Sequence, residues 1–161
     1  MTLQKEDKQA LINYKIERSE LALEAAIREF EAEDMFTASN RIYYACFYST
    51  EALMLTKDLS FKDHGRLKGE FNKRFVHEGL VDKKYSKILD NAFEQRQAGD
   101  YKNFVKFTKE EVKSSLDQAK IFVKDVIELT LKIIKDISID KTSTEIENQP
   151  DKNDPDPDID F

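Results

Sequence analysis

Apolar residues recur at intervals of three and four along the first part of the chain. From about residue 5 to residue 33 they are separated by Lys, Arg and Glu, which is the pattern of an amphipathic helix. The apolar positions are Leu11, Tyr14, Leu21, Ala25 and Ile27. The spacing therefore predicts one long helix.

A second helix is predicted from residue 35 to about residue 56. Asp34 can cap its first turn, because a short carboxylate side chain accepts hydrogen bonds from the free N–H groups of a helix start. The stripe expected to face inward mixes apolar and polar side chains, namely Phe36, Asn40, Tyr43, Phe47, Thr50 and Met54. Polar groups on an inward stripe indicate either an internal hydrogen-bond network that specifies packing or a binding site.

Two shorter helices follow. After a predicted loop at residues 58–65, the spacing predicts a helix at 66–76, and Gly79 prevents it from continuing. Another helix is predicted at 83–98, with Gly99 as its C-terminal stop. The expected inward residues are Leu67, Phe71 and Phe75 in the first of these helices, and Ile88, Leu89, Ala92 and Phe93 in the second.

The last predicted helix, residues 101–137, is long and can be capped by Asp100. Its apolar positions Val112, Leu116, Ala119, Val123 and Val126 follow the alternating spacing of a packing seam. We expect this helix to pair antiparallel with the first one. The predicted fold is therefore all-α, an up-and-down bundle of four to five antiparallel helices.

The helical pattern ends at Ser138, where Thr, Ser, Asn, Pro and Asp take over. We therefore divide the chain into a bundle at 1–137 and a disordered acidic tail at 138–161, because such a composition buries too little apolar surface to order itself. The acidic run ends on Phe161, which can serve as a docking peptide, and it distantly resembles the tails of bacterial single-stranded-DNA-binding proteins. The alternative is a solubilising tail.

Composition narrows the function classes. The chain of 161 residues fits one domain, and its net charge of −6 argues against an extended nucleic-acid footprint while allowing one local basic cleft. The single cysteine, Cys46, excludes an intrachain disulfide and a Cys-based zinc site. No stretch approaches the ~20 apolar residues that span a bilayer. We expect a cytoplasmic protein with no membrane partner.

The stretch from Ala38 to Tyr48 carries the most informative chemistry. It places a polar triplet that includes Asn40 and Arg41 beside Tyr43 and Tyr44 on one helix, without glycine or proline. An amide and a phenol one turn apart can share a hydrogen-bond network. These groups either satisfy one another in the core or bind a ligand, and packing is the simpler interpretation.

A second stretch runs from Arg96 to Tyr101 and includes Asp100. Arg96 follows the apolar face of its predicted helix, so its guanidinium group can emerge at the rim of a cleft, where its planar fork suits a phosphate. A structural salt bridge to Asp100, Glu51 or Glu70 is the alternative. The candidate ligand-binding residues are Asn40, Arg41, Tyr44, Arg96, Asp100 and Tyr101, and Arg96 and Tyr101 are also weak catalytic candidates.

The two histidines do not suggest a metal site. His64 and His77 are isolated in or near predicted loops, without a second ligand at metal-binding spacing. His64 can cap the third helix. The sequence also lacks a glycine-rich phosphate loop, a Ser-His-Asp arrangement and a zinc signature, so we expect neither a metal nor a cofactor.

In this order and within a helical bundle, these stretches resemble a prokaryotic branch of the HEPN family (higher eukaryotes and prokaryotes nucleotide-binding). The resemblance runs from Glu20 to about Val123. It is carried by Glu20, Leu21 and Ala25; by Phe36, Ala38, Arg41, Tyr43, Tyr44, Ala45, Phe47, Ala52 and Leu53; by His64, Phe71, Phe75 and Val76; by Arg96, Asp100 and Tyr101; and by Ala119, Phe122 and Val123.

The resemblance implies a homodimer with a cleft between subunits. It also implies an activity as a metal-independent ribonuclease or toxin, or a role as a partner of a nucleotidyltransferase. In active members an Arg is followed four to six residues later by a His. Here Arg96 is followed at those positions by Asp100, Tyr101 and Lys102, so the histidine is missing. A tyrosine, with a reference pKa of about 10, is a poor general base at neutral pH.

Three hypotheses follow. The first is a nucleotide- or RNA-binding module, non-catalytic or weakly catalytic, that works with a nucleotidyltransferase or within a toxin–antitoxin or defence system. The second is a divergent ribonuclease toxin that uses Arg96 with Tyr101, or with His64 brought in from another segment. The third is a structural helical adaptor in which the polar residues only determine packing.

Overall fold

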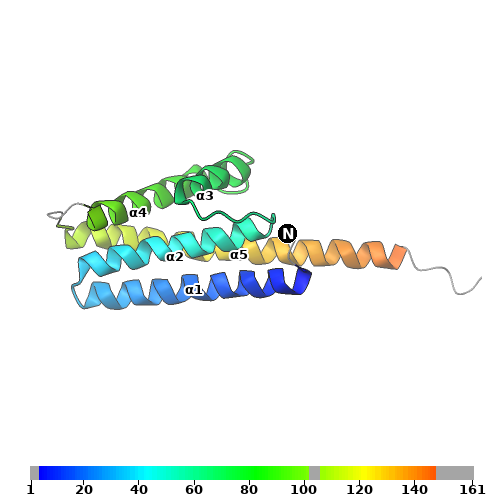
Figure 1. Cartoon of the computed structure of the whole chain (residues 1–161), viewed down its shortest axis with the longest axis horizontal. Coiled ribbons are helices and arrows are strands. Elements are labelled where there is room, and N and C mark those ends of the chain that lie inside the picture. Colours follow the sequence, from blue (N-terminus) through cyan, green and yellow to red (C-terminus); the bar gives the residue numbers. More distant parts are fainter. Residues whose placement is uncertain (1–3, 102–105, 148–161) are drawn as a thin grey trace, which may run out of the picture.

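The computed structural model describes residues 4–101 and 106–147, and these residues form helices joined by short connections. The helices are α1 (Lys5–Glu31), α2 (Met35–Leu55), α3 (His64–Phe71), α4 (Lys83–Tyr101) and α5 (Lys109–Glu147), and a π-helical turn, η1 (Asn72–Val76), continues α3. Figure 1 shows them as a bundle elongated along α5. The all-α class predicted from the sequence is confirmed.

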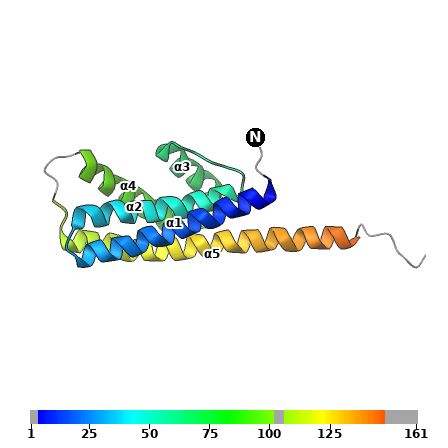
Figure 2. The same cartoon turned by 60° about the horizontal axis from the view of Figure 1, so that its bottom comes forward.

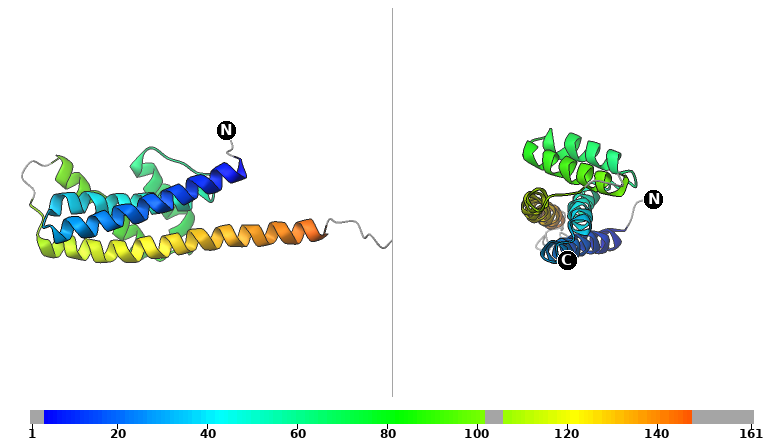
Figure 3. Two further views of the ribbon diagram at one scale, coloured as in Figure 1. Left: turned by 90° about the horizontal axis from the view of Figure 1, so that it is seen from below. Right: turned by 90° about the vertical axis from the view of Figure 1, so that its left-hand side faces the viewer.

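The four long helices alternate in direction. In Figures 1 and 2, α1 and α4 run one way along the bundle, and α2 and α5 run the other way. The view along the bundle in Figure 3 shows α3 and α4 on one side of α2 and α5, and α1 on the other side. The up-and-down topology and the antiparallel relation of the first and last helices are therefore confirmed. Among the described helices, none combines the length and the apolar composition needed to cross a membrane.

Helix α2 lies at the centre of the bundle, where it packs against α1, α4 and α5. Its alanines at three successive heptad positions, Ala38, Ala45 and Ala52, are fully buried, and small side chains allow neighbouring helices to approach closely. The buried hydroxyl of Ser19 in α1 donates a 2.6 Å hydrogen bond to the carbonyl oxygen of Ala45. This bond joins α1 to the backbone of α2.

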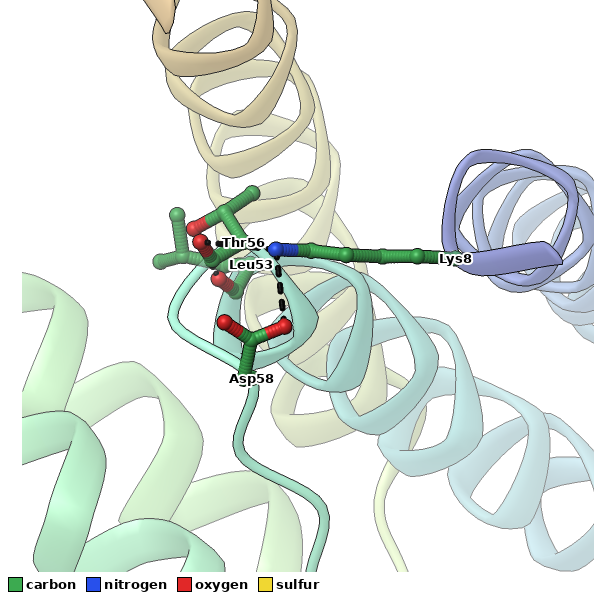
Figure 4. Close-up of polar contacts among 4 residues, drawn as sticks. All are labelled: Lys8, Leu53, Thr56 and Asp58. Atoms are coloured by element: carbon green, nitrogen blue, oxygen red, sulfur yellow. Dashed lines mark hydrogen bonds and ion pairs between the residues drawn. The ribbon is translucent and has the colours of Figure 1, made fainter. Parts of the chain in front are cut away.

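The end of α2 is also attached to α1. The Nζ atom of Lys8 lies 2.9 Å from a carboxylate oxygen of Asp58 and 3.5 Å from the carbonyl oxygen of Thr56. Figure 4 shows the Lys8 side chain reaching from α1 to these oxygens. A cation suits this place, because the last carbonyl groups of a helix carry partial negative charge.

Most of the predicted inward residues are buried. Asp34 caps α2 through a 3.0 Å bond from the Thr37 N–H. The five seam residues of α5 are at most 2% exposed. Phe36 is an exception with 51% exposure, so its assignment to the inward stripe was wrong. It lies on the first turn of α2, where its ring approaches Gly99 of α4 but half of its surface stays exposed.

Two helix boundaries differ from the sequence-based prediction. Helix α3 begins at His64 rather than residue 66, and the carboxylate of Asp63 is its cap, not His64. Helix α4 continues through Gly99 to Tyr101. Gly99 does not stop the helix: a Cβ there would lie 3.1 Å from the Phe107 ring and 3.2 Å from the Phe36 ring. Its role is therefore close packing.

Helix α5 also begins and ends later than predicted. Its cap is Thr108 rather than Asp100, because Thr108 and Glu111 exchange hydrogen bonds of 3.1 and 3.3 Å in a capping box. The helix continues ten residues past the expected boundary, to Glu147. Residues 138–147 include no glycine or proline that would end it. The rest of the predicted tail, residues 148–161, lies outside the described residues.

The aromatic core gives a stability prediction. Phe71 is fully buried, with ring centres 6.2 Å from Phe75 and 6.0 Å from Phe122. We expect Phe71→Ala to lower the free energy of unfolding by about 3–5 kcal/mol, because the substitution leaves a cavity. Urea denaturation followed by circular dichroism measures the loss. Phe36→Ala is the matched control, and an equal loss there would contradict the assignment of the core.

Candidate functional site

Helix α2 leaves one stripe of its surface uncovered. After Thr37, its half-buried positions are Asn40, Arg41, Tyr44, Tyr48 and Glu51. Asn40 and Arg41 are neighbours, and from them the stripe continues in steps of three or four residues, so these residues lie on one face. All of them are polar, charged or amphipathic, and several were expected to bind a ligand.

Arg96 of α4 lies against this stripe. Its Cζ atom is 5.1 Å from the centre of the Tyr43 ring and 5.2 Å from that of the Tyr44 ring. Both distances fall within the range of attractive cation–π contacts. Arg96 is itself half-buried. The structure therefore brings Arg96 together with the tyrosines of α2.

Arg41 approaches the same tyrosine. Its Cζ atom lies 5.2 Å from the centre of the Tyr44 ring. Its Nε and Nη2 atoms donate hydrogen bonds of 3.1 and 2.7 Å to Oδ1 of Asn40. The amide of Asn40 thus orients one guanidinium group beside Tyr44, and Arg96 supplies the second.

His64 also contacts Tyr43. The Tyr43 hydroxyl group and Nδ1 of His64 form a hydrogen bond. The imidazole ring stacks on Phe47 with the ring centres 4.5 Å apart, and the Phe93 ring is 6.2 Å away. His64 was predicted to lie in a loop, but as the first residue of α3 it reaches the aromatic residues of α2 and α4.

Burial and the arginine determine the charge state of these groups. Burial lowers the pKa of His64, and the positive charge of Arg96 lowers it further, while Asp63 acts in the opposite direction. Burial also raises the pKa of Tyr43 well above its ordinary value, and Arg96 partly opposes this effect. At neutral pH the site therefore holds a neutral imidazole and a protonated phenol beside a fixed guanidinium charge.

Three residues considered from the sequence remain, namely Asp100, Tyr101 and His77. Asp100 and Tyr101 belong to the last turn of α4, but their side chains lie outside the described part of the structure. His77 is exposed after η1. Among the side chains that the structure describes, no three His, Cys, Asp or Glu residues meet as metal ligands.

Two residues of the neighbouring surface, Arg18 and Tyr48, were assigned no role from the sequence. Arg18 of α1 lies with its Cζ atom 5.5 Å from the centre of the Tyr48 ring. Tyr48 was visible in the aromatic stretch, but Arg18 appeared as one of many charges on a solvated helix face. Its contact depends on how α1 packs on α2, which the spacing of apolar residues does not give.

Comparisons with known proteins identify the family. A family model described as the HEPN domain matches residues 12–132. The chain belongs to the HEPN domain family. It is 39% identical to the UPF0332 protein of Thermotoga maritima over 81% of this chain and 96% of that protein.

Two HEPN relatives come from Methanocaldococcus jannaschii, and each is provisionally named a toxin. One is 38% identical over 81% of this chain and 92% of its own length. The other is 33% identical over 67% of this chain and 74% of its own length. The matched residues include Arg41, Tyr44, His64 and Arg96, so the site lies within the HEPN domain.

The coupling between Arg96 and His64 can be measured. We expect Arg96→Gln to raise the pKa of His64 toward its reference value of about 6.5, because a nearby positive charge disfavours the imidazolium ion. NMR titration of the His64 ring resonances measures the shift. Arg74→Gln, which changes an exposed arginine paired with Glu70, serves as the control. An unchanged His64 titration in Arg96→Gln would show that the two groups do not interact.

Proposed function

We propose that the chain is an RNA- or nucleotide-binding HEPN module that holds a ligand phosphate at Arg96 and Arg41. The observation that carries the proposal is the convergence of both guanidinium groups on Tyr44, each with Cζ 5.2 Å from the ring centre. Planar guanidinium groups donate paired hydrogen bonds to phosphate oxygens and stay charged at any working pH. A half-buried tyrosine between them offers a surface on which a base can stack.

Electrostatics favours a ligand over a purely structural role. Two like charges beside one ring repel each other, and a phosphate placed between them removes that repulsion. In a purely structural site, a carboxylate would neutralise Arg41. Among the described residues, Arg41 forms no ion pair and bonds instead to the uncharged amide of Asn40.

The proposal includes a cellular context. The toxin names of two relatives support a place in a toxin–antitoxin or defence system. The HEPN resemblance supports a homodimer and a nucleotidyltransferase as partner. Exposed apolar side chains such as Tyr14, Leu21 and Phe36, which are 47–52% accessible, give a dimer surface to cover. A fully buried free thiol, Cys46, is consistent with the cytoplasm.

Binding of single-stranded RNA tests the proposal. We expect Arg96→Ala and Arg41→Ala each to weaken binding of a fluorescent oligoadenylate about 10–100-fold, because each removes charge-assisted hydrogen bonds to phosphate. Fluorescence anisotropy at fixed ionic strength measures the affinity. The fold should persist, since neither side chain is fully buried.

Arg74→Ala is the matched control, because Arg74 is exposed and held by Glu70 at 2.7 Å. It should bind RNA as the unaltered protein does. Equal weakening by all three substitutions would indicate a general charge effect, and unchanged binding in Arg96→Ala with a lower melting temperature would support the adaptor. Light scattering on the same samples should give the mass of a dimer.

A second function, metal-independent RNA cleavage, is favoured by the position of His64. The motif histidine of active HEPN members is missing, but His64 contacts Tyr43, which Arg96 also contacts. With Nδ1 donating to the Tyr43 oxygen, Nε2 can accept the proton of a ribose 2′-hydroxyl. The 2′-oxygen then attacks phosphorus, the bond to the 5′-oxygen breaks, and Arg96 stabilises the negative charge. The leaving oxygen takes the proton from the imidazolium ion or from water.

Cleavage of RNA in the presence of EDTA tests this second function. We expect a 2′,3′-cyclic phosphate product, and a rate about 100-fold or more lower in His64→Gln, in which an amide replaces the proton acceptor. Analysis of the products by mass spectrometry identifies the new ends. Equal rates for His64→Gln and the unaltered protein would exclude His64 from the chemistry, and the absence of any cleavage would leave binding as the function.

A further inference from the structure

The contacts between cations and tyrosines continue beyond Tyr44. Tyr48 lies one turn further along α2, about 6 Å along the helix axis, and its ring centre is 5.8 Å from that of Tyr44. Arg18 of α1 then lies 5.5 Å from the Tyr48 ring. Arg96, Arg41, Tyr44, Tyr48 and Arg18 thus form a continuous row, the cation–tyrosine row, with its arginines supplied by three helices.

The charges along this row are not all equivalent. Lys15 also lies over the Tyr48 ring, but its Nζ atom is 2.8 Å from the Glu51 carboxylate, which neutralises it. In the described part of the chain, Arg18 and Arg41 form no ion pair with a carboxylate. Arg18 and Arg41 are therefore the positive groups beside Tyr48 and Tyr44 whose charge an anionic ligand can neutralise.

We propose that the cation–tyrosine row is a track for single-stranded RNA, with two neighbouring bases stacked on Tyr44 and Tyr48 and successive phosphates at Arg96, Arg41 and Arg18. This inference rests on the proposed RNA-binding function and extends it from one phosphate site to a strand path. Half-buried rings keep accessible surface for a base. Alternating aromatic and cationic groups are how proteins bind single strands without reading the sequence.

The chemistry of the row selects unpaired RNA over a duplex. Stacking requires a free base face, and the bases of a duplex already cover each other's faces. The chain as a whole is acidic, with a net charge of −6, so the attraction is local and cannot support non-specific coating of a long duplex. A short single strand across α4, α2 and α1 fits a row of this length.

A second copy of the chain is the competing occupant. Tyr14 and Leu21, on α1 near Arg18 in sequence, are 52% and 47% exposed, and Tyr and Arg are common at protein–protein contacts. The charge pattern favours RNA, because among the described residues the row gathers three arginines on one face. An interface between identical faces would place these arginines near one another.

The test uses the full chain and two labelled probes, adenosine monophosphate and an oligoadenylate of about ten nucleotides. Affinity is measured by fluorescence anisotropy over a range of salt concentrations for the unaltered protein, Arg18→Ala, Tyr48→Leu, Arg96→Ala and Arg28→Ala. Arg28 is an exposed arginine of the same helix as Arg18, without a cation–π contact in the described part of the structure. It controls for the loss of one charge.

We expect Arg18→Ala to weaken the longer RNA roughly tenfold and to lower the salt slope of log K by about 0.7, the value for one lost single-strand phosphate contact. Tyr48→Leu should weaken the longer RNA to a similar extent with an unchanged slope, because it removes stacking but no charge. Both variants should bind the mononucleotide as the unaltered protein does, because its single base occupies Tyr44. Arg96→Ala should weaken both probes, and Arg28→Ala neither.

Three results would overturn the inference, and they differ from one another. Loss of both probes in Arg96→Ala together with normal binding of both in Arg18→Ala and Tyr48→Leu would reject the track and retain the proposed function. Failure of the unaltered protein to bind either probe would reject the track and the proposed function together. A change from dimer to monomer in Arg18→Ala, with equal weakening of both probes, would assign the row to a subunit interface.

Discussion

The enclosure of α2 by the other helices is the constraint on which the rest of the structure depends. Its side chains at Ala38, Ala45, Ala52 and Leu53 are completely inaccessible, so α1, α4 and α5 surround it. The buried hydroxyl groups of Ser49 and Thr50 bond to the carbonyl oxygen of Cys46, at 2.9 and 2.8 Å. With these two hydroxyl groups bonded, this part of α2 can tolerate burial on several faces.

Because α2 is covered on its other faces, only the residues of its single open stripe remain partly accessible after Thr37. Amphipathic side chains such as Tyr44 and Arg41 suit a half-buried position, since their apolar part packs while their polar end stays accessible. Neighbouring helices then add cations at the edges of the stripe, Arg96 from α4 and Arg18 from α1. A basic aromatic surface thus arises in a chain whose overall charge is negative.

Membership of the HEPN family supports the fold class, and the geometry of the site supports the proposed chemistry. The family match covers residues 12–132 and establishes the fold class and the relation to toxin-named proteins. It does not explain how a chain without the motif histidine could act on RNA. The position of His64 beside Tyr43 and within the electrostatic influence of Arg96 offers an answer in this chain's own residues.

The sequence by itself determined the helices, their order and most of the core, because apolar spacing and capping residues act locally. The seam of α5 and the Asp34 cap were predicted correctly for that reason. The end of α4 was not, because Gly99 serves close packing against Phe36 and Phe107 rather than ending the helix. The end of α5 was also wrong, because the helix continues to Glu147. Only the tertiary structure placed His64, Arg96 and Arg18 around the tyrosines of α2. Contacts between residues 21–53 positions apart depend on how helices pack in three dimensions, which the periodicity of a single helix does not encode.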